Sequence, residues 1–258
     1  TPCGTLFPYT TLFRSGATSV KALVVERTPD QVHILGRGRA VHAHGFAEDG
    51  TIGNLGALET ACEQALIQAE DASEGTTGHK VVPDAVLMSV PTAWVRGGVG
   101  TGRLAHLTVE EGLSADECAE VAVRAGRQAL RHLGRETKSG QWELLDGVIV
   151  DFGIDGRYVT DPVGFRGNLL EATTFVAAAP SRLLRVWREI AAALQLDPPW
   201  LVPEPVALAA ALPGSGLIIQ AGGAATGLIL ARHGGPLLFS TVQQGGMALE
   251  LALADTFQ

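Results

Sequence analysis

Three glycine-containing stretches of the chain have residue types that suit the binding of phosphate. They are GATSVKAL (16–23), EPVALAAALPGSGLIIQAGGAATGLIL (204–230) and QQGGMALELA (243–252). Glycine turns expose backbone N–H groups and let a phosphate come close, and the amino end of a helix favours anions. A single Gly-Gly pair is more often a plain turn than a phosphate site. Three such stretches in this order are more specific, and together they indicate a phosphate-binding site.

Other residue types that could do chemistry predict no metal site. The seven histidines show no metal-ligand spacing backed by other ligands. The three cysteines are too scattered for a zinc site or a disulfide framework, which favours a reducing cytoplasm. The run GGVGTG (97–102) has the composition of a nucleotide loop, but it lies between two β-rich runs, so we expect a flexible hairpin turn.

The spacing of apolar residues predicts strand hairpins that alternate with helices. Two β-rich runs flank a turn at 28–31, and a helix with Asn54 as its N-cap spans 55–70, before a polar loop at 73–80. A second helix begins at a capping box of Ser114 and Glu117 and ends at Gly134. Further strands are expected at 85–91, 142–154 and 168–179, and a further helix at 181–196. The fold class is therefore α/β with mixed sheets.

Composition and charge exclude several classes of protein. Hydrophobic residues make up 46% of the 258 residues and charged ones 18%, which is a globular composition. The net charge of −8 argues against nucleic-acid binding, which requires a basic face. The uncharged run 205–231 is long enough to span a membrane, but Pro213 and several glycines interrupt it. We expect a short helix, a turn and two buried strands there.

The segment TLFPYTTLFRS (5–15) has neither helical nor strand periodicity. One reading frame of a common sequencing-library adaptor translates into these residues without a mismatch. We therefore interpret residues 1–15 as an adaptor artefact and expect the natural chain to start near Gly16. The segment is expected to form either an extended, poorly packed tail or a strand that takes the place of a native first strand. We also expect the chain to be a fragment at its other end, because it stops within a predicted helix.

The order of these residues resembles the actin-like ATPase superfamily and, within it, the bacterial cell-division protein FtsA. GATSVKAL matches the first phosphate hairpin of that superfamily, and QAGGAATG (220–227) matches the second. EPVALAAAL (204–212) matches the connecting motif between them. DPVGFRGNLLEA (161–172) is close to a segment of the extra FtsA subdomain and is the most specific piece.

The resemblance implies a nucleotide site with ATP and Mg²⁺ as cofactors. Its candidate residues are Gly16, Ala17, Thr18, Lys21, Glu204, Gly222, Gly223, Thr226, Gly245 and Gly246. Lys21 falls where the phosphate-facing lysine of the family lies. Without the resemblance, a solvent-exposed lysine at the end of a strand is as good an interpretation of Lys21 as a phosphate contact. Glu204 could likewise be an acidic residue that the helix dipole favours at the start of a helix.

The resemblance also implies an actin-like (ribonuclease H-like) mixed-sheet lobe with an inserted strand–helix–strand–strand subdomain. We expect the first actin-like subdomain at 16–81 and 181–213 and the inserted subdomain at 82–180. The start of a second actin-like lobe is expected at 214–258. This inserted unit is what distinguishes FtsA and its pilus-assembly relative PilM from actin.

Two departures from the family pattern concern acidic residues. Gln220 and Gly227 stand where the second hairpin carries acids that help to hold magnesium, and a neutral amide is a poorer ligand for that ion. Arg14 and Ser15, the last two residues of the adaptor-like segment, stand at the Asp-Ile positions of the first hairpin, and we ascribe the loss of the acid there to that segment. We therefore assign no metal site, and we expect the chain to bind nucleotide weakly or not at all and to hydrolyse none.

The function implied by the resemblance is that of an FtsA-like cytoplasmic adaptor that polymerises and links the FtsZ ring to the inner face of the cell membrane. Its partners would be FtsZ, other divisome proteins and further copies of the chain, with no nucleic acid. The membrane-binding helix of that family lies at its far C-terminus, which this sequence does not include. The alternatives are a PilM-like scaffold of type IV pilus assembly and, from another class, a sugar or acid kinase of the same superfamily.

Overall fold

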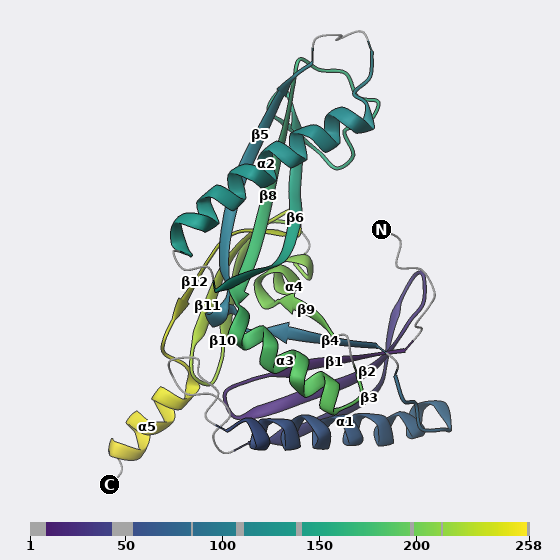
Figure 1. Cartoon of the computed structure of the whole chain (residues 1–258), viewed down its shortest axis with the longest axis vertical. Helices are drawn as coiled ribbons and strands as arrows, with labels where there is room; N and C mark the ends of the chain where they lie inside the picture. The colour runs from purple at the N-terminus through teal and green to yellow at the C-terminus, as the bar shows by residue number, and fades with distance from the viewer. Residues whose placement is uncertain are drawn as a thin grey trace.

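The computed structural model describes residues 9–42, 54–83, 85–106, 111–137, 141–196, 199–212 and 214–256. Within these ranges the chain forms three separate β-sheets, with helices packed against them (Figure 1). The five-stranded sheet and its helices lie at one end of the molecule. The four-stranded sheet projects away from it with its own helix, and the three-stranded sheet lies at the side (Figure 1).

The five-stranded sheet is mixed and has the order β3-β2-β1-β4-β9. Its strands are β1 (Tyr9–Ser15), β2 (Ser19–Arg27), β3 (Val32–Val41), β4 (Ala85–Val90) and β9 (Trp200–Pro203). The first three form an antiparallel meander, and the expected hairpin around residues 28–31 is confirmed. β4 pairs in parallel with both β1 and β9. β4 thus belongs to this sheet, although the expected boundary at residue 82 groups it with the inserted subdomain.

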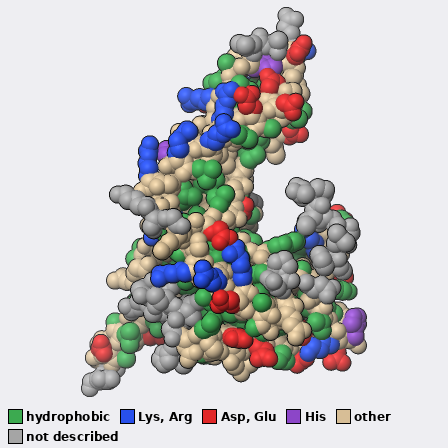
Figure 2. All heavy atoms as spheres, viewed as in Figure 1, with side chains coloured by type: hydrophobic (Ala, Val, Ile, Leu, Met, Phe, Trp, Pro, Cys, Tyr) green, Lys and Arg blue, Asp and Glu red, His purple; other side chains and the backbone are tan. Residues whose placement is uncertain are grey.

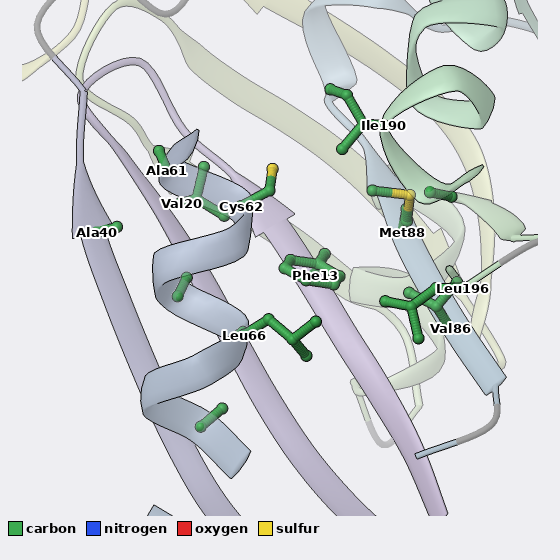
Figure 3. Packing of buried hydrophobic residues seen from close by; sticks show 14 of the residues in the cluster. Phe13, Val20, Ala40, Ala61, Cys62, Leu66, Val86, Met88, Ile190 and Leu196 are labelled. Atoms are coloured by element: carbon green, nitrogen blue, oxygen red, sulfur yellow. The ribbon is translucent and has the colours of Figure 1, made fainter. Parts of the chain in front are cut away.

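The adaptor-like segment supplies the central strand of this sheet. Of the two arrangements expected for it, the described residues adopt the strand, because Tyr9–Ser15 pairs along its length with β2 and in parallel with β4. Thr5 to Pro8 lie outside the described residues. Phe13 is only 4% exposed and packs between Leu66 and Met88 (Figure 3). Burial alternates along this strand, with Thr11, Phe13 and Ser15 on the buried face, although its apolar and polar residue types do not alternate.

Helices α1 (Leu55–Thr77) and α3 (Ser181–Ala193) pack over the sheet and close its core. Asn54 caps α1, since its side chain accepts a hydrogen bond from the Ala57 N–H. The end expected near residue 70 is wrong, because α1 continues through 71–77 and stops at Gly78, whose φ is 79°. Gly36 and Gly38 on β3 let α1 come close, since a Cβ at either would lie 1.9 Å from a carbonyl oxygen of the helix.

The four-stranded sheet is antiparallel and has the order β5-β8-β6-β7. It contains β5 (Arg96–Ala105), β6 (Trp142–Ile154), β7 (Arg157–Val159) and β8 (Leu169–Pro180), and α2 (Ala115–Glu136) packs across it. The capping box of Ser114 and Glu117 at the start of α2 is confirmed. The end expected at Gly134 is two residues too early, because α2 continues to Glu136. The unit β5-α2-β6-β8 is the expected inserted strand–helix–strand–strand arrangement.

The expected hairpin turn at GGVGTG is wrong, because these residues form the interior of the single strand β5. Glycine is required in this strand because α2 packs closely against it. A Cβ at Gly98, Gly100 or Gly102 would lie 2.2–2.3 Å from a backbone carbonyl oxygen of α2. Glycines at every second position therefore mark the strand face that the helix touches, and no turn is needed.

The motif DPVGFRGNLLEA connects β7 to β8 and supports the start of α2. Gly164 has a φ of 80°, and its N–H donates to the Leu113 carbonyl, while the Leu113 N–H donates to the Phe165 carbonyl. This motif is structural, because its hydrogen bonds fix the end of the inserted unit. Figure 2 shows Lys and Arg side chains on the same unit. The exposed arginines of α2 are Arg124, Arg127, Arg131 and Arg135.

The three-stranded sheet is antiparallel and comprises β10 (Gly216–Ala221), β11 (Thr226–Arg232) and β12 (Gly235–Val242). The short helix α4 (Glu204–Ala210) precedes it and α5 (Gly246–Thr256) follows it. The expectation of a buried strand at β10 is wrong, since Leu217 and Ile219 are 62% and 64% exposed. Among the described residues, no helix is long and apolar enough to cross a membrane.

Candidate functional site

A cavity of about 580 Å³ lies where the five-stranded and three-stranded sheets meet. Two glycine-containing turns form opposite parts of its wall, one between β1 and β2 and the other between β10 and β11. The turns come close together, because a Cβ at Gly223 would lie 3.3 Å from the Cβ of Ala17. The tertiary structure therefore joins two stretches that are more than 200 residues apart in the sequence.

The first turn is held by local hydrogen bonds. The Gly16 N–H donates to the Ser19 carbonyl at 2.9 Å, and the His42 N–H donates to the Thr18 carbonyl at 3.0 Å. Burial lowers the pKa of the His42 imidazole, and a hydrogen bond with the backbone of Gly16 offsets part of that effect. His42 therefore supports the turn from β3 in its neutral form at pH 7.

The second turn is supported from behind by the start of α5. The Gly222 N–H donates to the Ala225 carbonyl, while the N–H groups of Gly246 and Met247 donate to the carbonyls of Gly222 and Gly223, each at 2.9 Å. A Cβ at Gly245 would lie 2.4 Å from the Gly223 carbonyl oxygen, so this contact requires glycine. The first amides of α5 are thus committed to the turn and do not face the cavity.

The structure brings together most of the residues that the sequence nominates. Gly16, Ala17, Thr18, Lys21, Glu204, Gly222 and Gly223 line the cavity. Thr226, Gly245 and Gly246 do not line it: the hydroxyl of Thr226 donates to the Gln244 carbonyl, and the two glycines buttress the second turn. Gln220 and Gly227 also line the cavity, at the positions where the resemblance implies acids.

Glu204 lies at the centre of a polar network that spans four elements. Glu204 is 6% exposed, and its carboxylate accepts hydrogen bonds from Arg14 Nε at 2.8 Å, Thr92 N at 3.1 Å and Gln220 Nε2 at 3.0 Å. The Thr92 hydroxyl donates to Gln220 Oε1 at 3.1 Å. Both carboxylate oxygens are therefore occupied by donors from β1, from the 3₁₀ turn at Thr92–Trp94 and from β10. We call these four residues the Glu204 network.

Sequence reasoning missed three important residues of this cavity. No sequence motif surrounds Thr92. Its part in the site is identified only in the tertiary structure, where its backbone N–H donates to Glu204. Arg39 and Arg96 line the cavity as well, and they come from β3 and β5. The hairpin turn alone could not place Arg39, because a register shift between Val24 and Val25 decides that Arg39 lies opposite Lys21. Arg14 was seen only as a departure from the family pattern.

The residues present fit a phosphate group but do not fit a divalent cation. Of the residues that the structure describes, four cations, Arg14, Lys21, Arg39 and Arg96, and one carboxylate, that of Glu204, line the cavity. Mg²⁺ is usually held by one or two carboxylates in an octahedral shell of oxygens. Here both oxygens of that one carboxylate are committed, and a guanidinium lies against it. Among the described residues, no group of three or more His, Cys, Asp or Glu side chains is placed to hold a metal.

The mixed sheets, the inserted unit and the cavity between two glycine turns define an actin-like α/β fold. A solved structure of a PilM–PilN type IV pilus biogenesis complex is similar, with a TM-score of 0.53 and 16% identity; the alignment covers 97% of this chain and 65% of that one. The chain thus spans about two thirds of the length of that neighbour.

Two further solved structures are less similar. A protein of actin-like ATPase fold and unknown function from Bacteroides thetaiotaomicron gives a TM-score of 0.41 at 10% identity, with 97% of this chain and 76% of that one covered. The ethanolamine utilization protein EutJ from Carboxydothermus hydrogenoformans gives 0.43 at 14% identity, with 100% and 59% covered. No family model and no curated protein matches the chain.

Proposed function

We propose that this chain is an FtsA-like assembly protein that acts through protein contacts and does not transfer phosphoryl groups. The observation that carries the proposal is the neutral amide of Gln220, which lines the cavity where the resemblance implies an acid. This amide donates to the buried carboxylate of Glu204, which is also paired with Arg14, a residue of the segment that we interpret as an adaptor artefact. Among the described residues, the one carboxylate that lines the cavity is hydrogen-bonded on both oxygens and is not available to hold a metal ion or to orient an attacking water.

The proposed subdomains follow the sheets. We place the first actin-like subdomain around the five-stranded sheet, the inserted subdomain at β5, α2, β6, β7 and β8, and the start of a second lobe at the three-stranded sheet. The four-stranded sheet has its own apolar core with α2. Such a projecting unit is suited to contacts with another protein, because its outer surface is exposed on several sides (Figure 1).

The proposed partners are further copies of the chain and the C-terminal tail of FtsZ, at the inner face of the cell membrane. The test is fluorescence anisotropy with a labelled FtsZ tail peptide, together with phosphate release measured in ATP and Mg²⁺. We expect saturable binding of the peptide and phosphate release no faster than the buffer background. Hydrolysis well above that background would contradict the non-catalytic role.

A PilM-like scaffold of type IV pilus assembly is the second candidate, and the similarity to the PilM–PilN complex favours it. The two candidates differ in the peptide that each would bind. A PilM-like protein would bind a short N-terminal peptide of a membrane partner and would not bind the FtsZ tail. The same anisotropy assay with both peptides therefore separates them. A sugar or acid kinase is disfavoured, because it requires an acid at the position of Gln220.

A further inference from the structure

Helices α1 and α2 carry opposite charges. Between residues 121 and 135, α2 contains four arginines and no acidic residue. In contrast, α1 contains five acidic residues and neither lysine nor arginine. The helices have 23 and 22 residues, so each is about 33–35 Å long. Two helices of matching length and opposite charge can pack side by side along their whole length.

The positive charge of α2 lies along one side of the helix. Arg127, Arg131 and Arg135 follow one another at every fourth position, which places them in one row. All three side chains are exposed, and within the described ranges no carboxylate lies within ion-pair distance of them. Leu130 lies beside this row and is 45% exposed. We call the three residues the arginine stripe.

The negative charge of α1 is arranged in the same way. Glu59, Glu63 and Glu74 lie on one side of the helix, four and eleven residues apart, with Ile67 between them and 45% exposed. No lysine or arginine of the described chain lies within ion-pair distance of these three glutamates, and the other two acids of α1 share Lys80. We call Glu59, Glu63 and Glu74 the acidic stripe.

The two stripes do not meet within one copy of the chain. Helix α1 lies at the lower edge of the molecule, while α2 lies on the projecting four-stranded sheet at the other end (Figure 1). Figure 2 shows Asp and Glu side chains along that lower edge and Lys and Arg side chains on the projecting unit. Like charges four residues apart destabilise a helix, and both stripes contain such pairs. A surface of opposite charge would remove this repulsion, and a second copy supplies one for each stripe.

We propose that the arginine stripe of one copy docks on the acidic stripe of a second copy, with α2 of the first beside α1 of the second. Guanidinium groups match carboxylates in geometry, and Leu130 and Ile67 add an apolar contact within the charged surface. The contact is heterologous, because the two stripes differ. Each associated pair therefore keeps one free stripe of each sign, and further copies can add.

The first test is sedimentation velocity of the whole chain from micromolar to sub-millimolar concentration, in about 50 mM and about 500 mM salt. In low salt, the average mass should rise with concentration, and in high salt it should return to that of the single chain. Apolar association is not weakened by salt in this way. Association that is equal or stronger in high salt would assign it to apolar surfaces such as β10 and would overturn the proposal. A chain that stays monomeric throughout would also overturn it.

Reversal of one charge on each stripe tests the contact itself. Arg131→Glu and Glu63→Arg should each weaken association in low salt by about five- to tenfold, because attraction is replaced by repulsion. An equimolar mixture of the two variants should recover the association of the unmodified chain to within about twofold. In the mixture, the intact stripes of the two variants face each other, and so do their reversed charges. A mixture that associates no better than either variant would overturn the proposal.

Matched controls make the same changes of charge away from the stripes. Arg37 is exposed on β3 and projects from the face opposite to Gly36 and Gly38, which contact α1, and Glu189 is exposed on α3. Arg37→Glu and Glu189→Arg should change association by less than about twofold, alone or mixed. Losses equal to those of the stripe variants would show an effect of net charge and would overturn the proposal. All four substituted side chains are exposed, so unchanged melting curves are expected and would show that each variant is folded.

The inference rests on the proposed function in one respect, that further copies of the chain are among its partners, and it names the two surfaces that meet. Its failure is distinguishable from failure of the proposed function. Self-association is measured on the chain alone, whereas the proposed function is measured with partner peptides and by phosphate release.

Discussion

Arg14 and Glu204 are 190 positions apart in the sequence, yet Arg14 Nε lies 2.8 Å from Glu204 Oε1. The pair joins the central strand of the five-stranded sheet to the start of α4. The carboxylate is almost fully buried, while the guanidinium side chain is 47% exposed. A carboxylate in such a position needs a cationic partner, because an unpaired buried charge is strongly unfavourable. The contact also engages Glu204 Oε1, so this oxygen is not free to bind a metal ion.

Removal of the Arg14 guanidinium should destabilise the fold. We expect Arg14→Gln to lower the free energy of unfolding by about 1–2 kcal/mol, because Glu204 keeps its contacts with Thr92 and Gln220 but loses its charged partner. Urea denaturation of Arg14→Gln, Glu204→Gln and the double variant measures the coupling energy. Arg37→Gln is the control and should change stability by less than about 0.5 kcal/mol. Additive effects of the two single substitutions would contradict a direct interaction.

A magnesium site should appear if the two departures from the family pattern are reversed together. Arg14→Asp with Gln220→Asp would place two new carboxylates beside that of Glu204, which is the ligand chemistry that magnesium prefers. We expect this double variant to bind ATP more tightly in Mg²⁺ than in EDTA. Calorimetry in both buffers measures the change. Gln220→Asp alone keeps the Arg14 guanidinium and serves as the comparison; an equal Mg²⁺ dependence in both variants would show that Arg14 does not exclude the metal.

The glycines of β3 should be intolerant of a side chain. A Cβ at Gly38 would lie 1.9 Å from the Ala65 carbonyl oxygen, so Gly38→Ala must push α1 away from the sheet. We expect a loss of at least about 2 kcal/mol in the free energy of unfolding. Gly75→Ala is the matched control, because Gly75 lies within α1 with no atom within 4 Å of its added Cβ. That change should stabilise the chain by about 0.5–1 kcal/mol, and thermal melts of the two variants should shift in opposite directions.

The capping box of α2 should make stability depend on pH in the acidic range. Hydrogen bonds from the backbone of Ser114, from His106 and from the Ser114 hydroxyl lower the pKa of the Glu117 carboxyl to about 2. A lowered carboxyl pKa means that folding favours the ionised form. The stabilisation is therefore complete above the unfolded value of 4.5 and is lost as the pH falls from there towards 2.

The measurement is the melting temperature of the unmodified chain and of Glu117→Gln between pH 6 and pH 2. The unmodified chain should be more stable at pH 6, and the difference should shrink below pH 4.5. Glu63→Gln, an exposed position on α1, is the control and should show no such change. A difference between the chain and Glu117→Gln that stays constant down to pH 2 would show that the carboxylate is not stabilised by the cap.

Local signals in the sequence predicted many of the individual elements. The α2 capping box, the Asn54 cap and the β2–β3 hairpin depend on contacts within a few residues, so short-range chemistry is sufficient to specify them. The glycines of β5 could not be interpreted in this way. A run of glycine is equally consistent with a turn and with a strand that touches a helix, and only the packing of α2 decides between these.

The chain order of the glycine stretches was enough to indicate a phosphate-type cavity, and seven of the ten nominated residues line it. The sequence by itself determined which residue types are available there: two glycine turns, one glutamate, and no acid at Gln220 or Gly227. Only the tertiary structure decided that Arg14 neutralises Glu204 and that Arg14, Lys21 and Arg39 stand side by side. The physical reason is that charge balance in a cavity depends on distances between side chains from separate strands. Strand register and sheet packing set those distances, and spacing along the chain does not.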